Sequence, residues 1–368
     1  MTRIPFVDLK RQYAPIMNEI LEKTGMTISS CRFIGGEELD AFCRELADWW
    51  GTSGAVGVSS GTLGLYAALK VFGAGPGHEV ITTAHTAIPT SEAITMTGAR
   101  VVFCDIDPET YVIDPDKITS LINSRTRAII PVHLYGHPAD MDRIMDIARK
   151  HDLFIIEDCA QAQGAKYLDR TVGNIAHAGV LSFFPSKNLG CIGDGGAVTA
   201  ASGDVLENIR MFCNHGRREK YDHRFEGTNT RLDNVKAAML RTALPHLDRW
   251  NDMRRKAAQW YRERLEDLHE IILPRSDKKC THVYHLFVIQ APDRDALAGK
   301  LKEQGIQTGL HYPCSLNLLP AYRYLNKGPG SFPVAEKICS SVLSLPMFPG
   351  ITEDEVDVVC STLKKIYA

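Results

Sequence analysis

Lys187 and Asp158 are the two residues whose types and positions most clearly predict chemistry. Lys187 follows an apolar, strand-like run at residues 180–184 and precedes a glycine-rich segment. Asp158 comes just after another strand-like run, at residues 153–156. An amine and a carboxylate at the ends of two buried strands can converge on one ligand. Pyridoxal phosphate needs this pair, because its aldehyde binds a lysine covalently and its protonated ring nitrogen needs an anionic partner.

A candidate phosphate site lies at residues 59–62, where a strand-like segment changes into a helical pattern. The start of a helix binds phosphate through free backbone N–H groups and the positive end of the dipole. Gly61 permits close approach, and the Thr62 hydroxyl can donate. The same residues also fit an ordinary helix N-cap, but the presence of Lys187 and Asp158 favours the phosphate. The chain has no GxGxxG and no GKS or GKT motif, so a dinucleotide or P-loop site lacks its required residues.

The middle of the chain alternates strand-like and helical patterns, which is typical of an α/β domain. Apolar residues recur at helical spacing over residues 65–72 and 141–148. This alternation predicts a largely parallel sheet, with sites at the carboxyl ends of its strands. The strand candidates are residues 56–59, 101–103, 128–130, 153–156, 181–183 and 197–199.

The pattern changes near Leu247, where a charged helical segment at residues 250–268 precedes a strand-like run at residues 284–289. A chain of 368 residues is long enough for about two domains. We therefore expect a large domain over residues 1–246 and a smaller α+β domain over residues 247–368.

Composition argues against several classes of partner. A formal charge of −2 and a pI near 6.7 give no general attraction to nucleic acid or to anionic membranes. The first residues lack the continuous apolar region of a secretory signal, and no apolar run is long enough to span a bilayer. The ten cysteines are scattered without a CxxC pair. They predict reduced thiols in a cytoplasmic protein, and we expect no metal site.

Short motifs occur in order along almost the whole chain, at residues 5–9, 60–62, 131–136, 157–161, 182–196, 227–240, 311–313 and 345–349. Each motif alone is weak evidence. Together they resemble the DegT/DnrJ/EryC1/StrS family of sugar aminotransferases. That resemblance implies fold-type I architecture, which is aspartate aminotransferase-like, with pyridoxal 5′-phosphate as the cofactor.

The resemblance assigns roles to individual residues. Lys187 corresponds to the lysine that binds the cofactor and then acts as general base, and Asp158 to the partner of the ring nitrogen. Gln161 corresponds to a residue near the cofactor's phenol oxygen. Asn229 matches an asparagine that reaches the cofactor phosphate of the neighbouring subunit, so a homodimer with shared active sites is implied. Taken singly, Asp158 also fits an N-cap or an ion pair, and Asn229 a turn. The residues assigned to the phosphate are Gly61, Thr62 and Ser182.

The implied reaction moves an amino group from glutamate to a keto sugar carried on a nucleoside diphosphate. A dehydratase branch of the family has histidine in place of Lys187, so the lysine favours transamination. Three alternatives stay open: amination at C4, another pyridoxal phosphate reaction such as elimination or amination of a cyclitol, and a non-catalytic binding protein on the same fold.

Evidence for the substrate lies mainly in residues 214–223, where cations stand beside an aromatic ring. Cations suit a pyrophosphate, and the ring suits a base or sugar face. A solvated charged loop explains the composition equally well. The Lys220-Tyr221 motif, followed by GxNxR, resembles members that aminate C3 of dTDP-3-keto-6-deoxyhexoses. His311 and Tyr312 are a second candidate contact, with a packed pair at a strand end as the alternative.

Three residues depart from the common pattern of the family. Ala87 replaces an aromatic residue that stacks on the cofactor ring in many members. Gln163 stands where histidine is frequent, and Lys236 replaces a usual glutamine. None of these changes removes a group that the chemistry requires.

Overall fold

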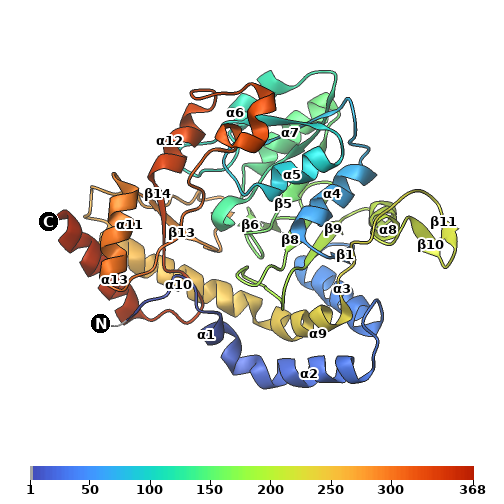
Figure 1. The fold of residues 1–368 in the computed structure, drawn as a ribbon, viewed down its shortest axis with the longest axis horizontal. Helices are drawn as coiled ribbons and strands as arrows, with labels where there is room; N and C mark the ends of the chain where they lie inside the picture. The colour runs from blue at the N-terminus through green and yellow to red at the C-terminus, as the bar shows by residue number, and fades with distance from the viewer. Residues whose placement is uncertain (1–2) are drawn as a thin grey trace.

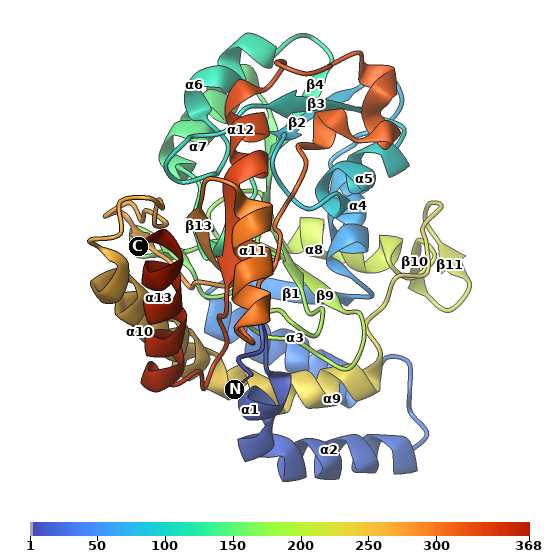
Figure 2. The same cartoon turned by 60° about the vertical axis from the view of Figure 1, so that its left-hand side comes forward.

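A seven-stranded sheet forms the centre of the fold in the computed structural model, which describes residues 3–368 (Figures 1 and 2). The strand order is β1-β9-β8-β5-β4-β2-β3. Strand β9 is antiparallel to both of its neighbours, and all other neighbouring pairs are parallel. The predicted, largely parallel sheet is therefore confirmed. The strands are β1 (Gly54–Val58), β2 (Glu79–Thr83), β3 (Arg100–Cys104), β4 (Thr126–Ile130), β5 (Phe154–Asp158), β8 (Ala178–Ser182) and β9 (Gly196–Ala200).

Each of the strand candidates overlaps one of these strands, and only β2 escaped the sequence analysis. All five residues of β2 are buried, but two of them are threonines. Thr82 satisfies its hydroxyl by donating to the carbonyl of Ile130 at 2.9 Å. Such internal pairing lets polar residues occupy a buried strand and hides the apolar run that would have revealed it.

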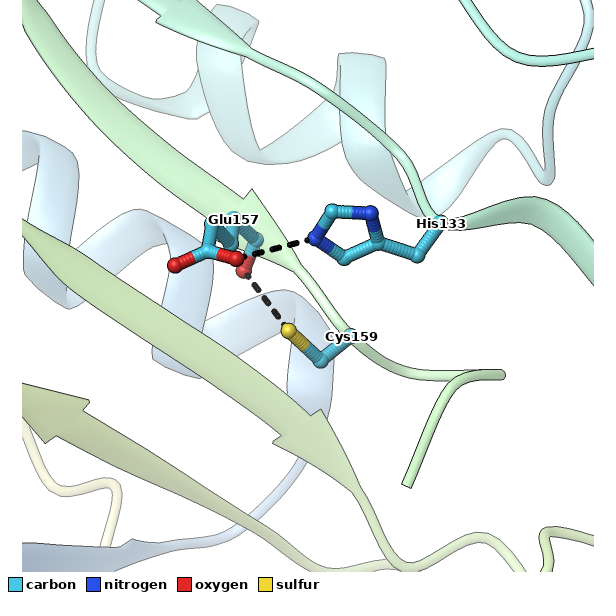
Figure 3. A group of neighbouring side chains, drawn as sticks. All are labelled: His133, Glu157 and Cys159. Atoms are coloured by element: carbon cyan, nitrogen blue, oxygen red, sulfur yellow. Dashed lines mark hydrogen bonds and ion pairs between the residues drawn. The ribbon is translucent and has the colours of Figure 1, made fainter. Parts of the chain in front are cut away.

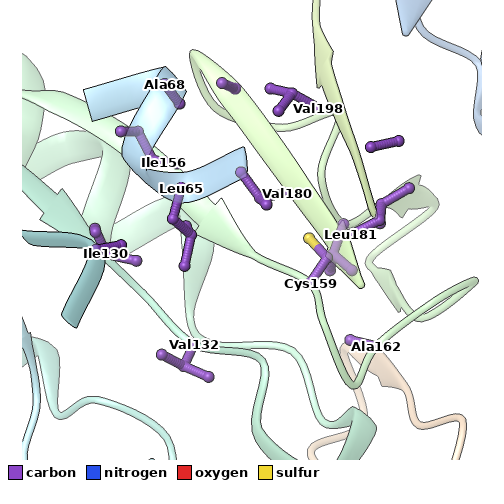
Figure 4. Packing of buried hydrophobic residues seen from close by; sticks show 14 of the residues in the cluster. Leu65, Ala68, Ile130, Val132, Ile156, Cys159, Ala162, Val180, Leu181 and Val198 are labelled. Atoms are coloured by element: carbon purple, nitrogen blue, oxygen red, sulfur yellow. The ribbon is translucent and has the colours of Figure 1, made fainter. Parts of the chain in front are cut away.

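Helix α4 (Gly61–Val71) packs tightly against the sheet (Figure 4). It begins after Ser60, whose hydroxyl accepts a hydrogen bond from the N–H of Leu63 at 3.2 Å. A Cβ on Gly64 would lie 2.8 Å from Cγ1 of Val180 in β8, so only glycine allows this close approach. The packing fixes the N-terminus of α4 beside the carboxyl ends of the strands.

Helix α7 begins where the sequence pattern predicts, at Met141, because Asp140 accepts a hydrogen bond from the N–H of Arg143. The helix (Met141–His151) is followed by Asp152, which has left-handed backbone angles and caps its end. The other helices around the main sheet are α3 (Glu37–Trp50), α5 (Pro89–Met96), α6 (Pro115–Ile118), α8 (Gly203–Phe212) and α9 (Asn234–Ala243).

A second hydrophobic core forms around the antiparallel pair β13 (Phe287–Gln290) and β14 (Val342–Leu345). The predicted strand at residues 284–289 is too early, because Tyr284 has a positive φ and the strand begins only at Phe287. Helix α10 supplies residues to both cores, so the division after residue 246 stays a prediction. The helices of this part of the chain are α10 (Leu247–Leu265), α11 (Arg294–Glu303), α12 (Pro333–Ser341), which packs against the first core, and α13 (Glu353–Tyr367).

Two further features stand out from the main sheet in Figures 1 and 2. The N-terminal helices α1 (Leu9–Tyr13) and α2 (Met17–Ser29) run below it, and α2 packs against α9. A hairpin of β10 (Arg217–Glu219) and β11 (Asp222–His223) projects from the body of the molecule.

Within the described residues, none of the helices has the length and apolar character needed to cross a membrane. A small sheet contains β6 (Lys166–Tyr167), β7 (Arg170–Thr171) and β12 (Cys280–Thr281).

Candidate active site

A cavity of about 250 Å³ lies where the chain leaves the carboxyl ends of the parallel strands. The segments after β2, β5 and β8 line it together with the start of α4. A larger hollow of about 720 Å³ lies beside α3, β1 and α8, and none of the predicted cofactor residues lines it. The predicted residues that line the 250 Å³ cavity are Gly61, Thr62, Asp158, Gln161, Ser182 and Lys187.

Asp158 is the last residue of β5, and its side chain is held in a fixed direction. Its Oδ2 accepts a 2.7 Å hydrogen bond from the hydroxyl of Thr90, and its Oδ1 accepts one of 3.1 Å from the N–H of Ala160. The backbone is fixed as well, because the N–H of Asp158 donates to the carbonyl of Pro131 at 2.9 Å. The residue is 5% exposed, so its carboxylate is a preorganised group in a mostly dry site.

Lys187 reaches the cavity from the loop after β8. Its N–H donates to the carbonyl of Phe184 at 2.8 Å in a tight turn. A Cβ on Gly190 would lie 2.4 Å from the carbonyl oxygen of Pro185, so the turn requires glycine. Burial lowers the pKa of Lys187 to about 8, and the charge of Asp158 partly opposes this. Across residues 3–368, the amine makes no hydrogen bond or ion pair.

The start of α4 offers a site for an anion. The N–H groups of Gly61 and Thr62 have no acceptor in the described part of the chain, since the Ser60 hydroxyl serves only Leu63. A Cβ on Gly196 would lie 2.8 Å from the carbonyl carbon of Ser60, so glycine allows β9 to pass directly behind this turn. The exposed donors match the predicted phosphate site.

Gln161 connects the cavity to the segment that contains His311 and Tyr312. Its Oε1 accepts from the N–H of Tyr135 at 2.7 Å, so its amide nitrogen must face the hydroxyl of Tyr312, 2.9 Å away. Burial raises the pKa of Tyr312 to about 12, which keeps its hydroxyl protonated. Burial, followed by the charge of Lys187, lowers the pKa of His311 to about 4. Both residues are therefore uncharged, and Tyr312 contacts the cavity through Gln161, although neither residue lines it.

The remaining predicted residues lie outside the cavity of their own chain. Asn229 is exposed and forms a bridge with Asn214. Lys220 and Tyr221 lie at the tip of the β10–β11 hairpin, where the Tyr221 side chain is 83% exposed and the Lys220 amine lies 5.3 Å from its ring centroid. Their assigned roles stay predictions.

The residues that depart from the family pattern have defined environments. Ala87 lines the cavity. Lys236 forms a 2.9 Å ion pair with Asp233. Gln163 is fully buried and donates to the carbonyl of Ser182 at 2.8 Å. It therefore supports the start of the loop after β8 that contains Lys187. Thr90 and this role of Gln163 were missed from sequence, because neither residue type nor spacing signals a contact across the fold.

His133, Glu157 and Cys159 form a buried cluster beside the strand end that carries Asp158 (Figure 3). The Glu157 carboxylate accepts hydrogen bonds from the N–H groups of residues 173, 175 and 176 at 2.8 to 2.9 Å. His133 Nδ1 accepts from the N–H of Ala139, so its Nε2 donates to Glu157 at 3.1 Å. These bonds use the groups that would bind a metal ion, and the cluster instead braces the end of β5.

The residues of the cavity fit pyridoxal phosphate. An amine without an acceptor could bind the aldehyde, a fixed carboxylate could meet the ring nitrogen, and the free N–H groups of α4 could hold the phosphate. The fold and the site therefore define an α/β enzyme of the pyridoxal phosphate-dependent aminotransferase architecture.

Comparison with known proteins identifies the family. Residues 15–364 match the DegT/DnrJ/EryC1/StrS aminotransferase family, and the chain belongs to it. A dTDP-3-amino-3,4,6-trideoxy-alpha-D-glucose transaminase of Streptomyces venezuelae is 43% identical, with 94% of this chain and 92% of the relative covered. A UDP-N-acetyl-3-dehydro-alpha-D-glucosamine 3-aminotransferase of Acidithiobacillus ferrooxidans is 42% identical, with 99% and 98% covered.

The fold agrees with that of a solved structure. The S. venezuelae DesV structure, in complex with a ketimine intermediate, superposes with a TM-score of 0.96 at 41% identity, covering 100% of this chain and 99% of the other. The predicted family and fold class are confirmed.

Proposed function

We propose that the protein is an aminotransferase that moves an amino group from glutamate to a keto sugar carried on a nucleoside diphosphate. The single cavity shared by Lys187, Asp158 and the start of α4, in a chain of an aminotransferase family, carries this proposal. Overall, glutamate becomes 2-oxoglutarate and the sugar carbonyl becomes an amine, with no net gain or loss of water.

Pyridoxal phosphate is the cofactor in this proposal. When bound, it supplies an electron-withdrawing ring that carries the amino group between donor and acceptor. Lys187 holds the aldehyde, Asp158 pairs with the ring nitrogen, and the start of α4 with Ser182 holds the phosphate. A lysine with a pKa of about 8 is partly neutral near neutral pH, so once released it can accept a proton from the carbon of the donor.

The acceptor is a dTDP-linked 3-keto-6-deoxyhexose, aminated at C3. Two observations support position 3: the names of both relatives specify it, and the Lys220-Tyr221 motif resembles members that act there. The two relatives differ in nucleotide, dTDP in one and UDP in the other. Amination at C4 of a 4-keto sugar is the alternative.

The active site is shared between the subunits of a homodimer. Asn229, Lys220 and Tyr221 lie outside the cavity of their own chain, and the hairpin that carries two of them projects outward. In a dimer, Asn229 could reach the cofactor phosphate of the partner subunit, and Lys220 and Tyr221 could reach the sugar nucleotide bound there. The cytoplasmic location stays a prediction.

A direct experiment starts from the enzyme loaded with pyridoxamine phosphate and adds keto-sugar nucleotides one at a time. A 3-keto-6-deoxyhexose on dTDP should restore the visible absorption band of the bound aldehyde and give a 3-amino sugar by mass spectrometry and NMR. Turnover of a 4-keto sugar alone would contradict the position. In a second arm, the enzyme is loaded with pyridoxal phosphate and mixed with glutamate, and no change in absorption there would contradict catalysis altogether and favour a binding protein.

A further inference from the structure

The position of Lys187 depends on the residues that follow it, because its own amine has no hydrogen-bond acceptor in the described chain. The next residue, Asn188, accepts a 3.1 Å bond at its carbonyl from the side chain of Gln12. Leu189 is held at both backbone groups by Gln163: its N–H donates to Oε1 at 2.7 Å, and its carbonyl accepts from Nε2 at 3.1 Å. The loop is therefore fixed from segments far away in sequence.

The side chain of Asn188 joins a hydrogen-bond chain whose direction is fully determined. The carbonyl of Gln163 can only accept, so Nδ2 of Asn251 donates to it at 2.9 Å. Oδ1 of Asn251 then accepts from Nδ2 of Asn188 at 2.8 Å. The remaining oxygen of Asn188 therefore accepts from Nδ1 of His285 at 3.1 Å, which makes His285 the Nδ1–H tautomer.

This chain is isolated from water. Asn188 and Asn251 are each 1% exposed, and His285 is 7% exposed. Burial also holds the pKa of His285 well below its usual value, and the charges of Lys187 and Arg254 add to this, so the ring is neutral. Removing one member leaves its buried partners without hydrogen bonds, a penalty that water cannot relieve.

We propose that Asn188 and Asn251 are positioning residues that fix the direction in which the Lys187 side chain enters the cavity. Asn251 belongs to α10, and His285 precedes β13. Lys187, in the loop after β8, is therefore oriented through hydrogen bonds to two elements that also contribute to the second core. The inference rests on the proposed function, because it assumes that Lys187 binds the cofactor. Asn188 acts through the backbone of the neighbouring lysine, and Asn251 acts through Asn188.

The charged and titratable groups around Lys187 allow a specific readout. Asp158 faces it from β5 and raises its pKa, whereas burial lowers it more strongly. The charge of Lys187 also lowers the pKa of His285 and of His311. If the asparagine pair keeps the amine in this partly buried position, its loss should expose the amine further to water and raise the pKa of Lys187.

The test compares Asn188→Ala, Asn251→Ala and the double variant with Asn317→Ala. Asn317 is a matched control, because it is 3% exposed and hydrogen-bonded to Lys327 and Glu336, away from the cavity. An amine reagent labels the cofactor-free proteins across a pH series, and mass spectrometry measures modification of Lys187. Both single variants and the double should raise the labelling midpoint by about one pH unit and weaken pyridoxal phosphate binding about tenfold. The double should lose less than the sum of the two single variants, since each single change already removes the bond between Asn188 and Asn251.

The melting temperature separates positioning from structure. All four variants should lose stability, but only those in the chain through Asn188 should change the labelling midpoint and cofactor affinity. The proposal is overturned if these variants behave like Asn317→Ala. Should Asn188→Ala not fold, Asn251→Ser gives the same decision. Borohydride reduction of the loaded wild type, with the label on a lysine other than Lys187, would instead defeat the proposed function.

Discussion

The hydroxyl of Thr90 donates a 2.7 Å hydrogen bond to Oδ2 of Asp158, and both residues are buried. Thr90 stands in the first turn of α5, whereas Asp158 ends β5. The bond orients the carboxylate that we assign to the ring nitrogen of the cofactor. The Thr90 hydroxyl, from the segment after β2, thus helps to hold the Asp158 carboxylate in place before any ligand binds.

Replacing Thr90 with valine should slow the glutamate half-reaction. A hydrogen bond to a charged group contributes about 1.5 to 3 kcal/mol, so we expect a loss of about 10- to 100-fold in rate. Thr90→Ser keeps the hydroxyl and serves as the control. Stopped-flow absorbance measures the rate, and equal rates for the valine and serine variants would show that the bond has no role in the reaction.

The amine of Lys187 should titrate well below an ordinary lysine. Because burial stabilises the neutral form, its pKa of about 8 means that the unprotonated amine appears as pH rises through 8. In the cofactor-free protein, modification of Lys187 by an amine reagent should therefore have its midpoint near pH 8. Exposed lysines of the same protein, quantified in the same digest, should react with a midpoint at about pH 10.4. If the two curves coincide, burial does not lower the pKa of Lys187.

Shared active sites predict complementation between two defective proteins. Lys187→Ala removes the covalent lysine, and Asn229→Ala removes the residue assigned to the partner's phosphate. Mixed dimers contain one site that is intact in both respects, so subunit exchange should restore part of the activity. Each protein mixed with itself is the control. Mixed dimers that form but stay inactive would mean that Asn229 serves its own subunit or has no role.

Lys220→Ala should affect the sugar half-reaction selectively. If Lys220 contacts the pyrophosphate, its loss should raise the Michaelis constant for the sugar nucleotide by about 10- to 100-fold, as expected for one charge-assisted contact. The glutamate half-reaction should hardly change, because glutamate has no diphosphate. Lys278→Ala is a control for the loss of a surface charge elsewhere. Equal damage to both half-reactions would assign Lys220 a structural role.

The sequence located the residues that stand at strand ends and missed those that support them. Asp158 and Lys187 were found because each follows an apolar run in an α/β pattern, where sites concentrate. Thr90 and Asn251 were not found, because threonine and asparagine are common and their partners are remote in sequence. The β13 strand was placed too early because Tyr284 looks β-forming, although its backbone is left-handed.

The covalent bond to Lys187 is the central claim, and borohydride reduction of the loaded enzyme tests it most directly. Reduction fixes the cofactor to whichever lysine carries it, and proteolysis with mass spectrometry then identifies the peptide. We predict one pyridoxyl label per chain, on Lys187, and no label in Lys187→Ala. A label on another lysine, or an unlabelled wild-type protein that still transfers amino groups, would contradict the account.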